Sequence, residues 1–120
     1  MALHNELGIL GEKIAMEHLR EKGYTILENN WISNHNEIDI IAKKDDTLVI
    51  VEVKTRRSNY LVAPDVAVDK FKQRRLILAA ESFVNRYNMD IDIRFDIISV
   101  VVDSNNNHVI EHIENAFYPV

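Results

Sequence analysis

The segment Thr47–Thr55 constrains the fold more than any other part of the chain, because its apolar residues occupy both sets of alternating positions. Side chains of a strand alternate between the two faces of a sheet, so a strand that is apolar on both faces needs cover on both sides. We therefore expect Thr47–Thr55 to be a central strand with helices packed on both faces of its sheet. The stretch Ile91–Val102 is similarly apolar toward its end and predicts a fourth strand.

In two segments the apolar residues recur about every 3.6 residues, which is the spacing of an amphipathic helix. The first is Asn5–Lys22, and Gly23 after it is a natural stop. The second is Asp65–Asn88, whose inward-facing residues we expect to be Phe71, Leu76, Ala79, Ala80, Phe83, Val84 and Tyr87. Three further segments are expected to be strands: Tyr24–Trp31, Glu37–Lys43 and His108–Ile113.

The order of these elements predicts an α/β fold with a central mixed β-sheet flanked by helices, in the order α-β-β-β-α-β-β. The polar residues Lys43–Asp46 form a hairpin turn, so the second and third strands are expected to be antiparallel neighbours. The long second helix is a crossover, which sets the fourth strand parallel to the third. With 120 residues, 47% of them apolar, the chain fits a single domain spanning residues 1–120.

Composition excludes several classes of protein and site. The absence of cysteine excludes disulfides and thiolate metal sites. No apolar run has the length of a signal peptide's core or of a membrane span, so a cytoplasmic protein with no membrane contact is expected. His108 and His112 are four residues apart in an expected strand, where this spacing does not converge on zinc as it would on a helix.

Charge is unevenly distributed along the chain. The net charge is −5, which argues against a protein that simply coats nucleic acid. Between Lys54 and Arg75, however, seven basic residues stand against two acidic ones, a local net charge of +5. The candidate nucleic-acid-binding residues in this stretch are Arg56, Arg57, Lys70, Arg74 and Arg75. They indicate either a phosphate-facing patch or a solvated loop and helix face.

Glu52 and Lys54 are two residues apart on the most apolar strand and therefore project from the same face. Charged groups in such a strand are costly unless they are paired or bound to something. Asp39 lies between two isoleucines on the neighbouring strand, so its carboxylate can approach Glu52 at one end of the sheet. Two carboxylates in a small space share a proton or hold a cation, and their oxygen atoms suit Mg²⁺ or Mn²⁺. With a lysine added, this is the composition of a phosphodiester-cleaving centre.

A carboxylate on one strand followed by Glu-x-Lys on the next resembles the PD-(D/E)xK pattern of restriction-endonuclease-like nucleases. More closely, the chain resembles the bacterial YraN-like family of uncharacterised proteins over about residues 5 to 102. The matching residues are Gly8, Gly11-Glu12, Ala15, Gly23-Tyr24, Asn30-Trp31, Glu37–Ala42, Val51–Arg56, Pro64, Lys70, Arg74 and Arg94–Asp96.

This resemblance implies a restriction-endonuclease-like core, metal-binding carboxylates at Asp39 and Glu52, and a catalytic lysine at Lys54. Archaeal Holliday-junction resolvases share the core, and in them a glutamate on the first helix also serves the site. The matching position here is Glu12, a fourth candidate catalytic residue. The implied cofactor is Mg²⁺ or Mn²⁺, and the implied partner is nucleic acid, DNA with a branched or otherwise structured form.

Simpler interpretations exist for the candidate site residues. Glu52 and Lys54 can form a structural ion pair, and Glu12 and Asp39 can be solvated acids. Other conspicuous residues are expected to be structural, namely an ion pair between Arg94 and Asp96 and core or edge packing of Trp31.

Three functions follow from these alternatives. The first is a metal-dependent endonuclease that hydrolyses phosphodiester bonds in DNA, with a homodimer as the natural way to cut both strands. The second is a non-catalytic nucleic-acid-binding module that has kept a nuclease fold. The third is a protein-interaction role, in which the excess of acidic residues neutralises the basic stretch.

Overall fold

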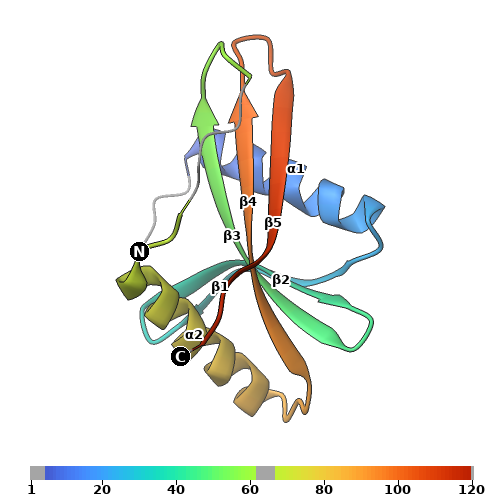
Figure 1. The fold of residues 1–120 in the computed structure, drawn as a ribbon, viewed down its shortest axis with the longest axis vertical. Helices are drawn as coiled ribbons and strands as arrows, with labels where there is room; N and C mark the ends of the chain where they lie inside the picture. The colour runs from blue at the N-terminus through green and yellow to red at the C-terminus, as the bar shows by residue number, and fades with distance from the viewer. Residues whose placement is uncertain (1–4, 62–66, 120) are drawn as a thin grey trace.

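The fold is taken from a computed structural model that describes residues 5–61 and 67–119. Within these residues the chain forms two helices and five strands in the expected order α-β-β-β-α-β-β (Figure 1). The helices are α1 (Glu6–Glu21) and α2 (Lys70–Arg86), and the strands are β1 (Thr25–Ser33), β2 (Asn36–Lys44), β3 (Thr47–Arg57), β4 (Asp92–Val102) and β5 (His108–Phe117).

The strands of the described residues form one mixed sheet in the order β1-β2-β3-β4-β5. β3 is the middle strand, as its apolar residues on both faces predict. It pairs antiparallel with β2 and parallel with β4, the parallel pairing running from Thr47↔Asp92 to Arg57↔Val102. The chain between β3 and β4 includes α2, which confirms the expected crossover, and β5 pairs antiparallel with β4 as an edge strand.

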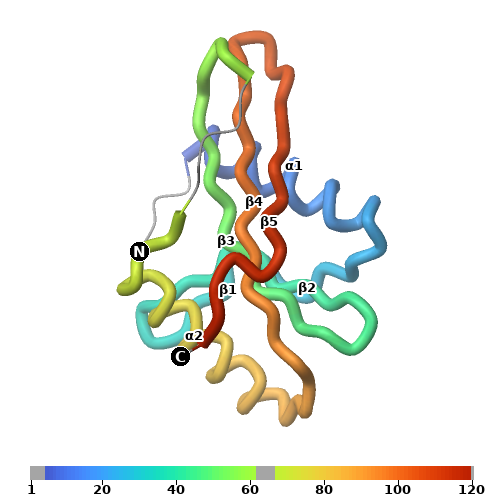
Figure 2. The backbone as a smooth tube through the Cα atoms, viewed as in Figure 1, coloured from blue at the N-terminus to red at the C-terminus, as the bar shows by residue number. Residues whose placement is uncertain are grey.

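Each face of the sheet carries its own apolar core and one helix. On β3, Leu48 and Ile50 belong to the core under α2, whereas Val49 and Val51 belong to the core under α1. All four side chains are buried, so the alternation of the strand supplies both cores in turn. Figure 1 shows α1 passing behind β3, β4 and β5, and Figure 2 shows the end of β3 and the turn between β4 and β5 projecting beyond it.

Helix α2 begins later than the apolar spacing predicts. Asp69 is its N-cap, and the Asp69 side chain accepts a hydrogen bond of 2.8 Å from the backbone N–H of Lys72. The first helical residue is therefore Lys70 instead of Asp65. Residues 65 and 66 of the expected helix lie outside the described residues.

Two aromatic residues expected to face the core from α2 are exposed instead. Phe71 is 73% exposed and Tyr87 is 49% exposed. Phe71 lies five residues before the buried Leu76, which turns it about 140° away from the buried stripe of the helix. Tyr87 is the C-cap, and its ring leans against Phe83 with 4.8 Å between the centroids without being covered on its outer side.

The strands β1 and β5 are longer than expected and irregular. The register of β1 with β2 shifts between Ile26 and Glu28. The register of β4 with β5 shifts between Phe95 and Ile97. On β1, Trp31 meets the ring of Phe83 edge-on at 5.2 Å, which confirms that it packs against the core. Neither helix of the described residues combines the length and apolar character needed to span a bilayer.

Candidate active site

The candidate site lies where β2 and β3 separate. Their pairing ends at Ile40↔Val51 and is not continued at Asp39. There Oδ2 of Asp39 accepts a hydrogen bond of 2.8 Å from the backbone N–H of Val53, in place of a carbonyl of a paired strand. The end of the pairing thus makes room for charged side chains between the strands, while the backbone donor of Val53 stays satisfied.

Glu52 is the most buried of the candidate catalytic residues, with 4% of its surface exposed. Its Oε2 lies 3.5 Å from Nζ of Lys54 and 3.5 Å from Nζ of Lys72, which is in the first turn of α2. Its Oε1 is buried and has no hydrogen-bond partner among the described residues. One oxygen of this carboxylate therefore faces two ammonium groups, while the other lacks the donor that a buried oxygen normally has.

The surroundings of Asp39 disfavour its negative charge. Burial is the largest cause that raises the pKa of Asp39, and Glu52 raises it further through its negative charge and through the hydrogen bond that a protonated Asp39 can donate to it. Glu12 acts in the same direction and the N–H of Val53 in the opposite one, and the resulting pKa of Asp39 is about 8. Because two carboxylates hydrogen-bond only through a proton, the pair is suited to hold either a proton or a cation.

Glu12 reaches the site because α1 lies very close to β3. At Gly11 a Cβ atom would lie 1.8 Å from Oγ1 of Thr55 and 2.7 Å from its Cβ, so the approach depends on glycine. Glu12, the next residue, is 8% exposed and lines a cleft of about 350 Å³. Asp39, Glu52 and Lys54 line the same cleft, so the fold brings all four candidate catalytic residues together.

Lys72 also lines this cleft, although its place among many basic residues hides it in the sequence. It lies four residues before Leu76 and seven before Ala79, both of which are buried on α2. Lys72 therefore continues the buried stripe of the helix by one turn toward its N-terminus. A lysine on the apolar stripe of an amphipathic helix was the signal that could have found it, since a charge there needs a partner.

The candidate nucleic-acid-binding residues lie outside the cleft. Arg57 donates a hydrogen bond of 2.6 Å from Nη1 to the backbone carbonyl of Asp103 in the turn after β4, which is a structural contact. Lys70 and Arg74 line a separate groove of about 350 Å³ together with Tyr118. All five candidates are exposed, namely Arg56, Arg57, Lys70, Arg74 and Arg75.

The ligand atoms of the cleft fit a hard divalent cation. Among residues 5–61 and 67–119, no three Asp, Glu or His side chains are grouped closely enough to hold one ion. The carboxylates of Asp39 and Glu52, with the backbone carbonyl of Val53, are nevertheless the oxygen ligands that Mg²⁺ and Mn²⁺ prefer, and Mg²⁺ commonly keeps several waters. The buried Oε1 of Glu52 without a donor fits an oxygen that binds a cation.

Comparison with known proteins assigns the chain to a family. The model of the uncharacterised protein family UPF0102 matches residues 11–100. The chain belongs to the UPF0102 family. A UPF0102 protein of Bacteroides thetaiotaomicron is 47% identical over 119 residues, which cover 99% of this chain and 98% of that protein. A UPF0102 protein of Flavobacterium psychrophilum is 48% identical with 98% of each chain covered, and one of Porphyromonas gingivalis is 48% identical with 98% and 87% covered.

Membership of UPF0102 confirms the resemblance to the YraN-like family of uncharacterised proteins. The matched segment, residues 11–100, contains all four candidate catalytic residues and Lys72 of this UPF0102 chain.

Proposed function

We propose that this UPF0102 protein is a metal-dependent endonuclease with a restriction-endonuclease-like core, which hydrolyses phosphodiester bonds in DNA. The observation that carries the proposal is the pair of Asp39 and the buried Glu52, placed beside Lys54 in an open cleft. Such a pair is unfavourable for the fold on its own, since Glu52 disfavours the negative charge of Asp39. Groups of this kind are typical of catalytic and metal-binding sites.

The side chains of the cleft have distinct roles in this proposal. Asp39 and Glu52 would hold a divalent cation, which would polarise the phosphate and lower the pKa of a bound water. The N–H of Val53 fixes the orientation of the Asp39 carboxylate through its hydrogen bond of 2.8 Å. Lys54, whose side chain is 45% exposed, can turn from Glu52 to donate to the attacking water or to a phosphate oxygen. Glu12 lines the same cleft, and we propose that it orients that water.

The substrate we propose is branched or structured DNA. Exposed arginines such as Arg56, Arg74 and Arg75 would hold the phosphate backbone, which positions DNA without reading its bases. Because cutting both strands requires two centres, we propose that two copies of the chain act as a homodimer. Acting on DNA inside the cell also agrees with a cytoplasmic location.

One observation favours a second function, a non-catalytic nucleic-acid-binding module with a nuclease fold. Lys54 and Lys72 both lie 3.5 Å from Glu52, so the charge of this carboxylate is partly neutralised without a cation. A protein that used Glu52 only as an ion-pair partner would bind DNA and cut none of it.

The test is cleavage of labelled DNA as single strand, duplex, flap and four-way junction, with Mn²⁺, with Mg²⁺ and with a chelator. We expect metal-dependent cutting that falls by about 100-fold or more in Lys54→Ala and in Glu52→Gln. Lys13→Ala is the matched control, because Lys13 is exposed on α1 next to Glu12 and does not line the cleft. Binding without cutting under any of these conditions would favour the binding module. Absence of binding even at low salt would favour the protein-interaction role.

A further inference from the structure

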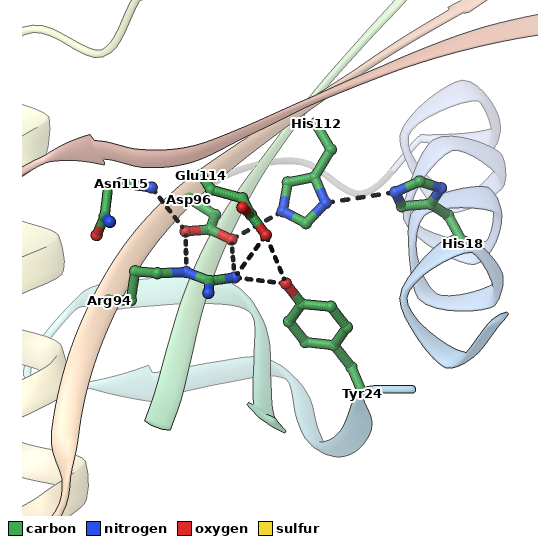
Figure 3. Close-up of polar contacts among 7 residues, drawn as sticks. All are labelled: His18, Tyr24, Arg94, Asp96, His112, Glu114 and Asn115. Carbon is green, nitrogen blue, oxygen red and sulfur yellow. Dashed lines mark hydrogen bonds and ion pairs between the residues drawn. The ribbon is translucent and has the colours of Figure 1, made fainter. Parts of the chain in front are cut away.

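A second cluster of ionisable side chains lies apart from the cleft and is centred on Asp96 of β4, which is 0% exposed. Arg94 donates to both carboxylate oxygens of Asp96, at 2.9 and 2.8 Å (Figure 3). Nε2 of His112 lies 2.7 Å from Oδ2, and the backbone N–H of Asn115 donates to Oδ1 at 3.1 Å. The expected pair of Arg94 and Asp96 is thus confirmed and forms part of a larger network.

The network continues from Asp96 toward a cavity. Nδ1 of His112 lies 3.3 Å from Nε2 of His18 on α1. Arg94 donates to the hydroxyl of Tyr24, which in turn donates to Oε1 of Glu114 at 3.2 Å (Figure 3). The cavity has a volume of about 430 Å³ and shares no lining residue with the cleft of the candidate active site. Its lining residues are His18, Lys22, Tyr24, Lys44, His112 and Glu114.

The cavity has an excess of positive charge. Lys22 and Lys44 line it directly, and Nζ of Lys44 lies 4.8 Å from the centre of the Tyr24 ring. Arg94 lies behind the Tyr24 hydroxyl, and its charge is balanced by Asp96, to which it donates two hydrogen bonds. The negative charge of Asp96 is already taken up by its own donors, and Glu114 is the one acid among the described residues that line the cavity. The arrangement therefore suits an anion.

The carboxylate of Glu114 is held only weakly by the side chains around it. Its side chain is 59% exposed, and its Oε1 lies 3.4 Å from Nη2 of Arg94 and 3.2 Å from the Tyr24 hydroxyl. Asp96, in contrast, has 0% of its side chain exposed and lies 2.8 Å from the same Nη2. An exposed carboxylate with contacts of this length gains little from them, so another anion can displace it. The position of its Oε1 marks where an oxygen of that anion would accept hydrogen bonds.

We propose that this cavity binds a phosphate group, which replaces the Glu114 carboxylate on Arg94 and Tyr24 and is neutralised by Lys22 and Lys44. A phosphate fits better than a carboxylate because it carries more negative charge and offers more acceptor oxygens to donors that approach from several sides. Inorganic phosphate and the terminal phosphate of a nucleic-acid strand offer this same chemistry. The site is independent of the proposed nuclease activity.

The first experiment is titration of the full chain with inorganic phosphate at constant ionic strength, followed by the NMR resonances of the His18 and His112 rings and by calorimetry. We expect saturable binding that shifts both rings. Glu114→Gln should bind phosphate about three- to tenfold more tightly, because it removes the competing charge and keeps a partner for Tyr24. Lys44→Ala should bind it about three- to tenfold more weakly.

Matched controls are available beside both substituted residues. Glu111→Gln removes a negative charge from β5, as Glu114→Gln does, and Lys43→Ala removes a positive charge next to Lys44, as Lys44→Ala does. Glu111 and Lys43 are both exposed, and neither lines the cavity. We expect both controls to bind phosphate like the wild type. Opposite signs for Glu114→Gln and Lys44→Ala separate the proposal from a loss of folding, which would weaken binding in both.

Two oligonucleotides distinguish the sources of the phosphate. Tighter binding of a strand with a 5′-phosphate than of the same strand with a 5′-hydroxyl, reversed by inorganic phosphate, assigns the cavity to strand ends. Equal binding of the two strands, with inorganic phosphate still shifting His18 and His112, assigns it to free phosphate. The proposal is overturned if neither ring responds to phosphate up to about 20 mM, or if Glu114→Gln binds no more tightly than the wild type.

Discussion

The surroundings of Asp96 and Asp39 shift the pKa values of these two carboxyl groups in opposite directions. Burial alone would raise the pKa of Asp96, but the hydrogen bonds from His112 and Arg94 and the charge of Arg94 outweigh it, and the pKa is lowered. Asp39 faces Glu52, and its pKa is raised. The partners of Asp96 are thus built into the protein, whereas Asp39 needs a proton or a cation from solution.

The first prediction concerns the stability that Asp96 contributes. Asp96→Asn should lower the free energy of unfolding at pH 7 by about 2–4 kcal/mol, because Arg94 and His112 lose a buried carboxylate. The folded-state pKa of Asp96 lies below its ordinary value of 3.8, so its contribution is present above that pH and is lost as the pH falls through the lowered pKa. The difference from wild type should therefore shrink below about pH 4.

Urea denaturation between about pH 3 and pH 7 measures this difference. Asp92→Asn is the control, since Asp92 is exposed at the start of the same strand. If Asp92→Asn and Asp96→Asn changed stability equally at every pH, the assigned role of the Asp96 network would be wrong.

The second prediction concerns the cation proposed for Asp39 and Glu52. Mn²⁺ at about 100 times its Kd should stabilise the folded protein by about 2.7 kcal/mol and raise its Tm accordingly. Glu52→Gln should remove this shift, whereas Glu28→Gln, at an exposed position on β1, should retain it. Scanning calorimetry with Mn²⁺ and with a chelator makes the measurement without any substrate. A shift of equal size in both variants would locate the cation elsewhere.

At the scale of elements, β3 was the most predictable part of the fold and the start of α2 the least. Apolar residues at every position of Leu48–Val51 can be buried only in a strand with a core on each side, so the sequence determines where β3 lies. The start of α2 depends on a choice between two aspartates, Asp65 and Asp69, that are equally good N-caps by type. Apolar spacing started the expected helix at Asp65 and turned Phe71 inward, whereas α2 begins at Lys70 and turns Phe71 about 140° away from the buried Leu76.

The two candidate sites also differ in how far the sequence predicts them. The pattern of Asp39, Glu52 and Lys54 was readable because two neighbouring strands and a two-residue spacing relate these side chains locally. Contacts such as His18 with His112, 94 residues apart, arise only from the packing of a helix against a distant strand. No local spacing reports such a contact, so the phosphate cavity was invisible in the sequence.

The third prediction tests the close approach of α1 to β3. Gly11→Ala should destabilise the protein by about 1–3 kcal/mol, because the new Cβ would overlap Thr55 and α1 would have to move away. Gly8→Ala is the matched control on the same helix, where the nearest atom to an added Cβ is Oδ1 of Asn5 at 3.3 Å. It should change the free energy of unfolding by less than about 1 kcal/mol, since alanine also favours the helix. Chemical denaturation of both variants makes the comparison.

The same two variants distinguish an effect on stability from an effect on the position of Glu12 in the cleft. If α1 shifts in Gly11→Ala, Glu12 moves with it, and cleavage should fall even at temperatures where the variant is fully folded. An active and stable Gly11→Ala protein would show that the contact with Thr55 does not position Glu12.

At the scale of the whole molecule, α1 connects the two candidate sites. It contributes Glu12 to the cleft and His18 and Lys22 to the phosphate cavity. Glu12 and His18 are six residues apart, which is about 9 Å along the helix axis. Both sites therefore depend on how this one helix is seated on the sheet, and any ligand that moves it would affect both.

The fourth prediction follows from the charge of the whole chain. The net charge of −5 disfavours contact with DNA, so we expect the proposed DNA binding to depend on the basic stretch between Lys54 and Arg75. Each phosphate contact adds about 0.9 to the slope of log affinity against log salt for duplex DNA. Replacing Arg74 and Arg75 together by alanine should therefore reduce that slope by about 2, measured by fluorescence anisotropy with a chelator between about 50 and 200 mM KCl. Replacing Arg20 and Arg86 together changes the net charge equally at exposed positions outside this stretch and should leave the slope unchanged. Equal losses in the two double variants would mean that net charge alone governs binding, and that Arg74 and Arg75 do not contact the DNA backbone.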